Sequence, residues 1–270
     1  MTADEVRYTD VVCIGAGFAG ICVGAQLQRQ LGVDSFHIYE REASVGGTWF
    51  KNQYPGVMCD VPSIVYSLSF APRRNWSDLY APYQEILAYL TDVSRKYDLE
   101  RRTSLRTQVT AAAWDDERKR WRVTLRNVDS GAEFAHECKL LFTGVGQFGR
   151  PRTVEDLGAI GPERFAGPIL LSTSWDHSVD LTGKRVVLIG NGCTSCGFLT
   201  PWCLVSAACL RTLSILRHGQ PNPPSSRRQG REHRATFTKQ TLDRTRRTPG
   251  AGRHRRVHGT ICAVDRAYFP

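Results

Sequence analysis

The sequence predicts an α/β protein in which apolar strands lead into glycine-rich turns. An apolar run from Tyr8 to Ile14 enters the turn Gly15–Gly20, and a second run, Val186 to Ile189, enters another turn at Gly190. A buried strand followed by closely spaced glycines is the pattern of a strand–turn–helix unit that binds a nucleotide phosphate. The second turn is not followed by an amphipathic helix, and the composition changes after residue 195. The prediction therefore covers only the chain up to that point.

The first turn belongs to a complete strand–helix–strand unit. The helical pattern ICVGAQLQRQLG ends near Gly32, and the strand pattern DSFHIYE follows it. We expect Gly15 to make the tight turn, Gly17 to let the backbone approach a pyrophosphate, and Gly20 to let the helix pack on the strand. The helix N-terminus adds unpaired N–H groups and the positive end of a dipole. The alternative is a glycine-rich turn in an ordinary α/β domain.

Glu40 ends the second strand, twenty residues after Gly20. At this position a carboxylate can accept hydrogen bonds from ribose hydroxyl groups. An acidic side chain there disfavours a 2′-phosphate. The first site therefore suits FAD or NAD better than NADP.

Residues 44–70 contain three motifs in one segment, Gly46-Gly47-Thr48-Trp49, Tyr54-Pro55-Gly56 and Cys59-Asp60. A helix-like segment at 82–99 and strand-like segments within 108–125 follow them. In this order the motifs resemble those of the flavin-dependent monooxygenases of the Baeyer–Villiger type, over about residues 8–195.

The resemblance implies the domain organisation. Residues 1–155 would form a Rossmann-like FAD-binding domain of the three-layer ββα type, closed by the strand and glycine turn at 140–151, which we interpret as a linker feature. Residues 156–195 would be the start of a second, incomplete NADP-binding Rossmann domain. Residues 196–270 would be an aberrant, largely disordered basic tail.

The resemblance also implies which residues act. Asp60 matches an aspartate near the isoalloxazine and nicotinamide rings and is the candidate catalytic residue. The sequence independently places Asp60 in a loop bounded by glycine and proline among apolar residues, where a carboxylate is costly without a partner. A turn or cap role for Asp60, and simple core packing for Trp49, are the alternatives. The residues implied to bind FAD are Gly15, Gly17, Phe18, Gly20, Glu40, Gly47, Thr48, Trp49, Asp60, Tyr66 and Val109, and those implied to bind NADPH are Gly190, Asn191, Gly192, Thr194 and Ser195.

The implied activity is that of an oxidoreductase. With FAD and NADPH as cofactors, the family inserts one oxygen atom from O₂ into a ketone to give an ester or lactone, here in natural-product biosynthesis. An N- or S-oxidising flavin monooxygenase and a truncated, non-catalytic flavoprotein are the alternatives. No metal is expected, and the oligomeric state is not predicted.

One family position departs from the pattern. Before the second glycine turn the family carries F-x-G-x-x-x-H-x-x-x-W-D/P, and Leu171 stands at the histidine position. Leucine neither donates a hydrogen bond nor titrates. Its neighbour His177 does not replace the histidine by spacing and is expected on the surface. The departure puts catalytic competence in doubt.

Charge and cysteine content limit the remaining functions. Residues 1–195 carry a net charge of −1 and residues 196–270 one of +11, for a total of +10. An arginine-rich tail can be a nucleic-acid arm, but this one lacks interleaved aromatic residues for base stacking, so no nucleic-acid partner is expected. The nine scattered cysteines follow no secretory signal, and no apolar run reaches membrane-spanning length. These features predict a cytoplasmic protein with reduced thiols.

The tail after Ser195 is consistent with a change of reading frame in an otherwise ordinary family member. Read one base out of frame, residues 221–224 permit the string QILP, and residues 234–245 permit VQLSRSKHWIVP. Both strings resemble family motifs, in the family's order. Residues 196–219 would then be a retained intron or small insertion. We expect the codons of the gene to give both strings in the shifted frame; sequencing the DNA checks this, and codons that do not give them would end the hypothesis.

Overall fold

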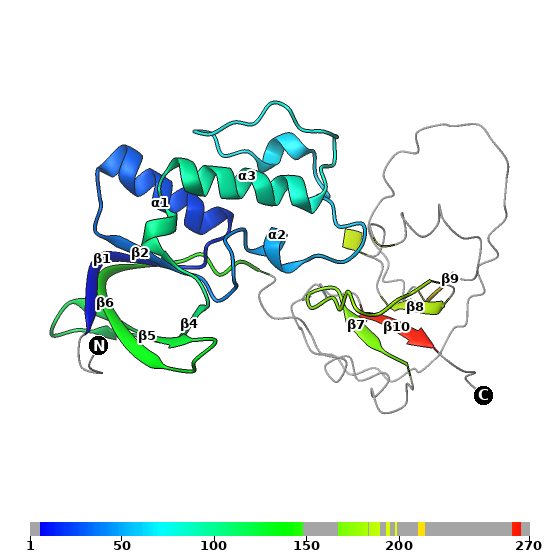
Figure 1. Cartoon of the computed structure of the whole chain (residues 1–270). Coiled ribbons are helices and arrows are strands. Elements are labelled where there is room, and N and C mark those ends of the chain that lie inside the picture. Colours follow the sequence, from blue (N-terminus) through cyan, green and yellow to red (C-terminus); the bar gives the residue numbers. More distant parts are fainter. Residues whose placement is uncertain are drawn as a thin grey trace, which may run out of the picture. The chain divides into compact units, whose positions relative to one another are not determined.

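The computed structural model describes residues 6–147, 167–182, 184–189, 193–194, 198, 210–213 and 261–265 (Figure 1). Two sheets lie within these residues, and each is considered by itself. The expected boundary between residues 155 and 156 falls outside the described residues and stays a prediction. No helix in the described part of the chain is long and apolar enough to cross a bilayer.

The first sheet has six strands in the order β3-β2-β1-β6-β5-β4. The strands β3, β2, β1 and β6 run parallel, and β5 and β4 continue the sheet in antiparallel fashion. This part of the chain contains β1 (Arg7–Ile14), α1 (Phe18–Leu31), β2 (Phe36–Tyr39), α2 (Thr48–Lys51), η1 (Ser63–Tyr66), α3 (Tyr83–Lys96), η2 (Glu100–Arg102), β3 (Thr103–Ser104), β4 (Thr107–Asp115), β5 (Arg120–Asn127) and β6 (Glu133–Thr143). The predicted strand–helix–strand unit is confirmed as β1, α1 and β2.

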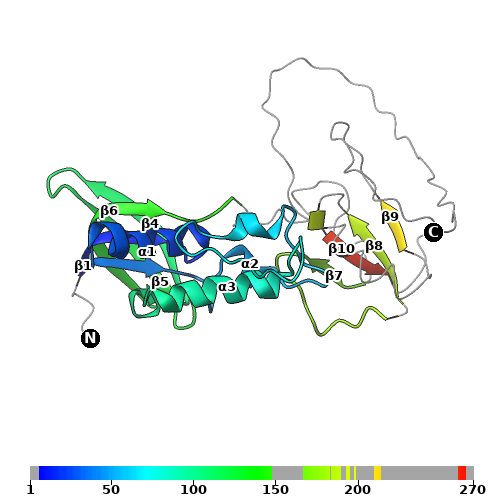
Figure 2. The same ribbon diagram turned by 90° about the horizontal axis from the view of Figure 1, so that it is seen from above.

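Helices α1 and α3 lie side by side on one face of the parallel strands (Figures 1 and 2). In α3 the buried residues Ile86, Tyr89, Leu90 and Val93 recur at helical spacing, so one stripe of the helix faces the core. They belong to a core cluster that also contains Ile38 of β2. The helix expected at 82–99 is thereby confirmed.

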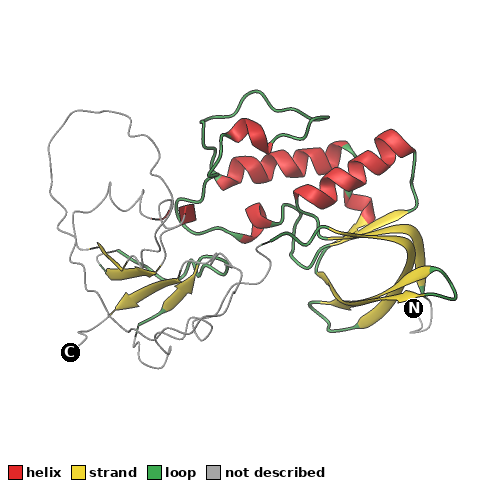
Figure 3. Cartoon of the chain, turned by 180° about the vertical axis from the view of Figure 1, so that it is seen from behind, coloured by secondary structure: helices red, strands yellow, loops and turns green. Residues whose placement is uncertain are grey.

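The sheet is strongly curled, so that its antiparallel end turns over the face opposite the helices (Figure 3). A second core forms inside this curl from Val12, Tyr39, Val123, Leu125 and Cys138. Successive side chains of a strand point to opposite faces of the sheet, so alternate residues of β1 pack into the two different cores. Helices, parallel strands and curled antiparallel strands make up the three layers of the predicted ββα fold.

The second sheet has four strands in the order β7-β10-β8-β9. They are β7 (Ile169–Leu171), β8 (Arg185–Ile189), β9 (Leu210–Leu213) and β10 (Ile261–Asp265). Strand β8 confirms the apolar run that precedes the second glycine turn. Strand β9 pairs with β8 in parallel, and β10 pairs with β7 and β8 in antiparallel fashion.

The strands β9 and β10 both fall within residues 196–270, the tail that the sequence predicts to be aberrant and largely disordered, and that prediction stays untested. Apolar residues in each segment suit a strand, and the open edges of β7 and β8 give them backbone partners. The rest of the tail lies outside the described residues, apart from Phe198.

A polar network around His136 is enclosed in the second core. The Thr9 hydroxyl donates to the Val11 carbonyl, so Thr9 Oγ1 accepts from His136 Nε2 at 3.0 Å. His136 Nδ1 is then left to accept from the Tyr39 hydroxyl at 2.6 Å. The neutral imidazole satisfies both bonds. Burial lowers the pKa of His136 to about 4, and the charges of His37 and Arg7 act in the same direction.

This low pKa predicts a loss of stability on mild acidification. Between pH 6.5 and about 4 the unfolded chain binds a proton at His136 that the folded chain excludes, so the free energy of unfolding falls as the pH falls. We expect the fall between pH 7 and pH 5 to be smaller by about 1–2 kcal/mol in His136→Gln than in the unchanged protein, since glutamine keeps a donor and an acceptor without titrating. Urea unfolding at the two pH values measures it.

The same change at the exposed His177 is the control for this experiment. An equal fall in the His136→Gln variant and the unchanged protein would show that folding does not lower the pKa of His136.

Candidate nucleotide-binding site

The first glycine turn is too crowded for side chains at two of its glycines. Gly15 has φ +96°, and a Cβ atom there would lie 2.6 Å from the carbonyl oxygen of Gly144. A Cβ atom on Gly20 would lie 1.9 Å from the carbonyl oxygen of Gly15. The tight turn at Gly15 and the close helix–strand packing at Gly20 are therefore present as the sequence predicts.

Gly17 differs from these two glycines, because it has room. It is the N-cap residue of α1 with φ −81° and offers no side chain to the helix N-terminus. A Cβ atom on Gly17 would meet the Cα atom of Gly47 at 3.5 Å and its N atom at 3.9 Å, which is ordinary contact. No protein atom therefore requires glycine at this position, and the first turn of α1 has N–H groups that its N-cap residue does not satisfy.

The loop at residues 46–47 lies against the glycine turn. The N–H of Gly46 donates to the carbonyl of Ala16 at 2.9 Å. Gly46 has φ +118° and Gly47 has φ +55°, a region that favours glycine at both positions. A Cβ atom on Gly46 would also lie 2.4 Å from Leu87 Cδ1 of α3. The two glycine motifs of the sequence thus form one backbone surface.

Glu40 is buried at the end of β2 and accepts two backbone hydrogen bonds. Its Oε2 accepts from the N–H of Ala16 at 2.8 Å, and its Oε1 accepts from the N–H of Glu42 at 3.0 Å. The carboxylate therefore holds the glycine turn in addition to its expected role. A carboxylate has about four acceptor positions, so each oxygen can still accept from a ribose hydroxyl.

Three aromatic residues from separate segments gather beside the turn. Phe18 begins α1, Trp49 lies in α2 and Tyr66 ends η1. The Tyr66 ring lies 5.0 Å from the Trp49 ring, edge to face, and 5.9 Å from the Phe18 ring. Trp49 is 8% exposed and belongs to the core cluster, so the packing alternative for Trp49 holds. This role does not exclude contact with a cofactor.

Asp60 is tied to this aromatic group by a hydrogen bond. The Tyr66 hydroxyl donates to Asp60 Oδ1 at 3.3 Å. Burial, and next the negative charge of Asp60, raise the pKa of Tyr66, so the phenol stays protonated and remains a donor. The Asp60 side chain is exposed, which corrects the expectation of a carboxylate among apolar surroundings. The expected partner is present.

The remaining predicted FAD residues are placed by the structure as follows. Thr48 is exposed at the start of α2. Val109 lies in β4, where its side chain packs on the second core next to a break in the strand register. The N–H of Thr107 donates to the carbonyl of Glu40 at 2.8 Å, which ties the start of β4 to the end of β2.

The predicted NADPH residues are mostly outside the described part of the chain. Gly190, Asn191, Gly192 and Ser195 lie there, and their roles stay predictions. Thr194 is half-buried in a helical turn with Cys193.

Leu171, which departs from the family pattern, lies within the described residues. Leu171 is the last residue of β7 and is half-buried. His177 is exposed, as expected. The Asp176 carboxylate accepts from the N–H and hydroxyl of Ser178 at 2.9 and 2.6 Å, which lowers the pKa of Asp176. Asp176 therefore serves as a turn residue.

Gly144 is a residue that the sequence reasoning missed. The segment 140–151 was expected to close the domain as a linker feature, and its strand is confirmed within β6. In addition, the N–H of Gly144 donates to the carbonyl of Ile14 at 2.7 Å, and its carbonyl faces Gly15. The third glycine-rich stretch therefore forms a wall of the first turn. The GVG pattern after an apolar strand is the signal that could have indicated this.

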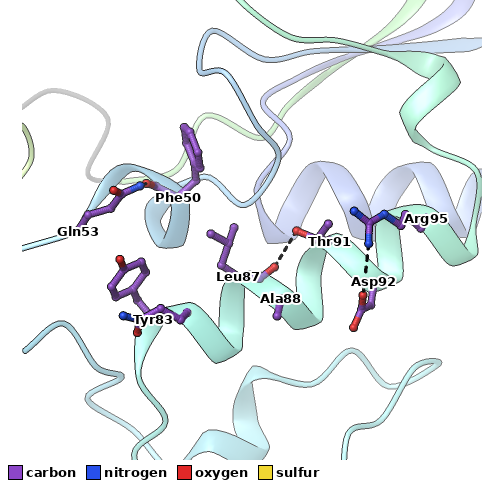
Figure 4. A pocket seen from close by; sticks show the side chains of 9 residues that line it. Phe50, Gln53, Tyr83, Leu87, Ala88, Thr91, Asp92 and Arg95 are labelled. Atoms are coloured by element: carbon purple, nitrogen blue, oxygen red, sulfur yellow. Dashed lines mark hydrogen bonds and ion pairs between the residues drawn. The ribbon is translucent and has the colours of Figure 1, made fainter.

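A pocket of about 420 Å³ lies along α3 and α2 (Figure 4). None of the predicted site residues lines it, although Leu87 contributes to both the pocket and the packing against Gly46. Its lining is mostly apolar, with the exposed pair Asp92 and Arg95 at one end (Figure 4). The lining residues are Phe50, Gln53, Tyr83, Gln84, Leu87, Ala88, Thr91, Asp92 and Arg95.

Comparison with known proteins gives matches over most of the described chain. The NAD(P)-binding Rossmann-like domain family matches residues 13–83. The FAD-binding monooxygenase BOA2 of Botryotinia fuckeliana is 36% identical over 203 residues, 74% of this chain and 37% of that protein. A Baeyer–Villiger monooxygenase of Pseudomonas aeruginosa is 38% identical over 198 residues, 73% of this chain and 36% of that protein. The chain thus spans little more than a third of the length of these relatives.

The solved structures agree with these relatives. An oxidized steroid monooxygenase bound to NADP is 37% identical, with a TM-score of 0.63, and the match covers 75% of this chain and 38% of that one. The similarity therefore extends from sequence to fold.

The different surroundings of Gly20 and Gly17 predict different effects of the same substitution. Gly20→Ala is expected to lower the free energy of unfolding by about 2–4 kcal/mol, because the new methyl group overlaps a backbone oxygen. Gly17→Ala is expected to change it by less than about 1 kcal/mol. Thermal and urea unfolding of the two variants measure the difference. Equal losses would mean that the turn is not packed as described.

Proposed function

Since this chain is related over about three quarters of its length to FAD-binding and Baeyer–Villiger monooxygenases, we propose that residues 6–147 bind FAD. We propose further that the whole protein is an FAD- and NADPH-dependent monooxygenase that inserts one oxygen atom from O₂ into a ketone. The observation that carries this proposal is the meeting of the Gly15 turn, the Gly46–Gly47 loop and Glu40 at the start of α1.

The residues at this meeting point fit a dinucleotide with a free ribose. The first turn of α1 and the room at Gly17 suit a pyrophosphate, which the helix dipole favours. Glu40 keeps acceptor positions for ribose hydroxyls and disfavours a 2′-phosphate. The aromatic group of Phe18, Trp49 and Tyr66 offers apolar surface for a planar ring system.

In this proposal the chain's own groups bind and orient. Bound FAD supplies the oxidation chemistry, with NADPH as reductant and O₂ as oxidant. The Tyr66 hydroxyl holds Asp60, and the Asp60 carboxylate orients the reacting partners at the edge of the aromatic group. Gly190, Asn191, Gly192, Thr194 and Ser195 are proposed to bind NADPH. The ketone is proposed to belong to secondary metabolism.

A second function has its own support. Leu171 stands where the family carries histidine, and leucine neither donates a hydrogen bond nor titrates. A flavoprotein that binds FAD and does not turn over a ketone is therefore the competing proposal.

Flavin binding tests the first proposal directly. The purified full chain is expected to be yellow and to retain FAD through gel filtration. Gly17→Ala is expected to weaken FAD binding by about tenfold or more, since the methyl group occupies the approach of the phosphates, while the thermal unfolding midpoint stays near that of the unchanged protein. Flavin absorbance and fluorescence titration measure both. A colourless chain that takes up no FAD would contradict the proposal.

Oxygen consumption then separates the two functions. A chain that uses NADPH only when O₂ and a ketone are present, and forms an ester or lactone, is a monooxygenase. A steroid ketone and cyclohexanone serve as probes, with product identified by mass spectrometry. A yellow chain that forms no product from either would favour the non-catalytic flavoprotein.

A further inference from the structure

Asp60 lies in a short exposed loop that has little support of its own. It occupies a bend between the buried residues Cys59 and Ser63, and the two intervening residues, Val61 and Pro62, are exposed. Its side chain accepts one hydrogen bond, from Tyr66 at the far end of η1. The position of the carboxylate therefore depends on what holds the two ends of this loop.

Both ends are tied to the segment that precedes α3. The N–H of Cys59 donates to the carbonyl of Ala81 at 3.1 Å. The N–H of Ser63 donates to the carbonyl of Leu79 at 2.7 Å. These two hydrogen bonds fix the two ends of the Asp60 loop to residues 79–81.

The Ser63 side chain strengthens the second anchor. Ser63 is 2% exposed, and its Oγ accepts from the N–H of Ala81 at 2.7 Å. The same hydroxyl lies 2.9 Å from the carbonyls of Asp78 and Leu79, and its single proton is donated to one of them at a time. One buried hydroxyl thus joins the start of η1 to three backbone groups.

Loss of this hydroxyl would leave buried backbone groups without their partner. An unsatisfied buried N–H is costly, so the Ala81 N–H would move toward water or another acceptor. Such a movement separates η1 from residues 79–81. Tyr66 ends η1, so its bond to Asp60 would be disturbed with it.

We propose that Ser63 is a positioning residue, whose buried hydroxyl fixes the loop so that the Asp60 carboxylate stays on the Tyr66 hydroxyl. The consequence for catalysis rests on the proposed function of Asp60. The positioning itself is a property of the folded chain and can be measured without flavin.

Ionisation of the Tyr66 phenol reports on this arrangement. The Asp60 carboxylate helps to raise the pKa of Tyr66, so moving it away lowers that pKa. In the full chain, NMR of ¹³C-labelled tyrosine during a pH titration measures it, with the Tyr66 signal assigned from Tyr66→Phe. We expect Ser63→Ala and Asp60→Asn each to lower the Tyr66 pKa, and the double variant to lower it no further than Asp60→Asn alone.

A matched control is available in α3. Ser94 is fully buried, and its hydroxyl has no hydrogen-bond partner among the described residues. Ser94→Ala removes the same atom from a similar environment and is expected to leave the Tyr66 pKa unchanged. If Ser63→Ala does not fold, Ser63→Cys keeps a weak donor at the same site, and a smaller shift that again vanishes in the Asp60→Asn background supports the proposal.

The outcomes of the titration separate the positioning role of Ser63 from the proposed binding of FAD. An unchanged Tyr66 pKa in Ser63→Ala, or shifts that add in the double variant, would overturn the positioning role. Because the titration contains no flavin, its result stands whether or not the chain binds FAD. If the chain binds FAD, the same cycle applied to the FAD dissociation constant should show Ser63→Ala weakening binding only when Asp60 is present.

Discussion

The arrangement depends on backbone segments that meet at the first glycine turn with no space for side chains. The carbonyl oxygen of Gly144 lies 2.6 Å from where a Cβ atom on Gly15 would be, and the carbonyl oxygen of Gly15 lies 1.9 Å from where one on Gly20 would be. The Gly46 N–H joins a further loop to the same turn. This packing sets α1 against β1 and places β6 and the Gly46–Gly47 loop beside the helix N-terminus. The residues proposed to bind FAD are positioned relative to these backbone contacts at the first glycine turn.

The Glu40 carboxylate contributes both to the fold and to the candidate site. Its carboxylate is buried, yet each oxygen accepts a backbone N–H, so the cost of burial is offset by hydrogen bonds to a charged acceptor. The carboxylate that we propose for the ribose in this way also supports the turn. Tyr66 has a similar double use, since it packs on Trp49 and donates to Asp60.

The second sheet differs from the first in the parts of the chain that supply its strands. Strand β8 leads toward the second glycine turn, but the strands beside it, β9 and β10, come from the arginine-rich part of the chain. Leu171 ends β7 without the hydrogen-bonding capacity of a histidine. The described residues therefore contain the whole of the first glycine turn, whereas Gly190, Asn191, Gly192 and Ser195 of the second turn lie outside them.

The sequence by itself determined the local units. The spacing of Gly15, Gly17, Gly20 and Glu40, the apolar period of α3 and the run before Gly190 are short-range patterns, and each predicts its element because a strand or helix repeats at a known interval. Only the tertiary structure decided which segments meet. That Gly144 walls the Gly15 turn, that Glu40 holds Ala16, that Asp60 is exposed, and that Ser63 anchors its loop are contacts between residues distant along the chain or set by burial. Such contacts leave no period in the sequence, because they follow from how the curled sheet and its helices pack.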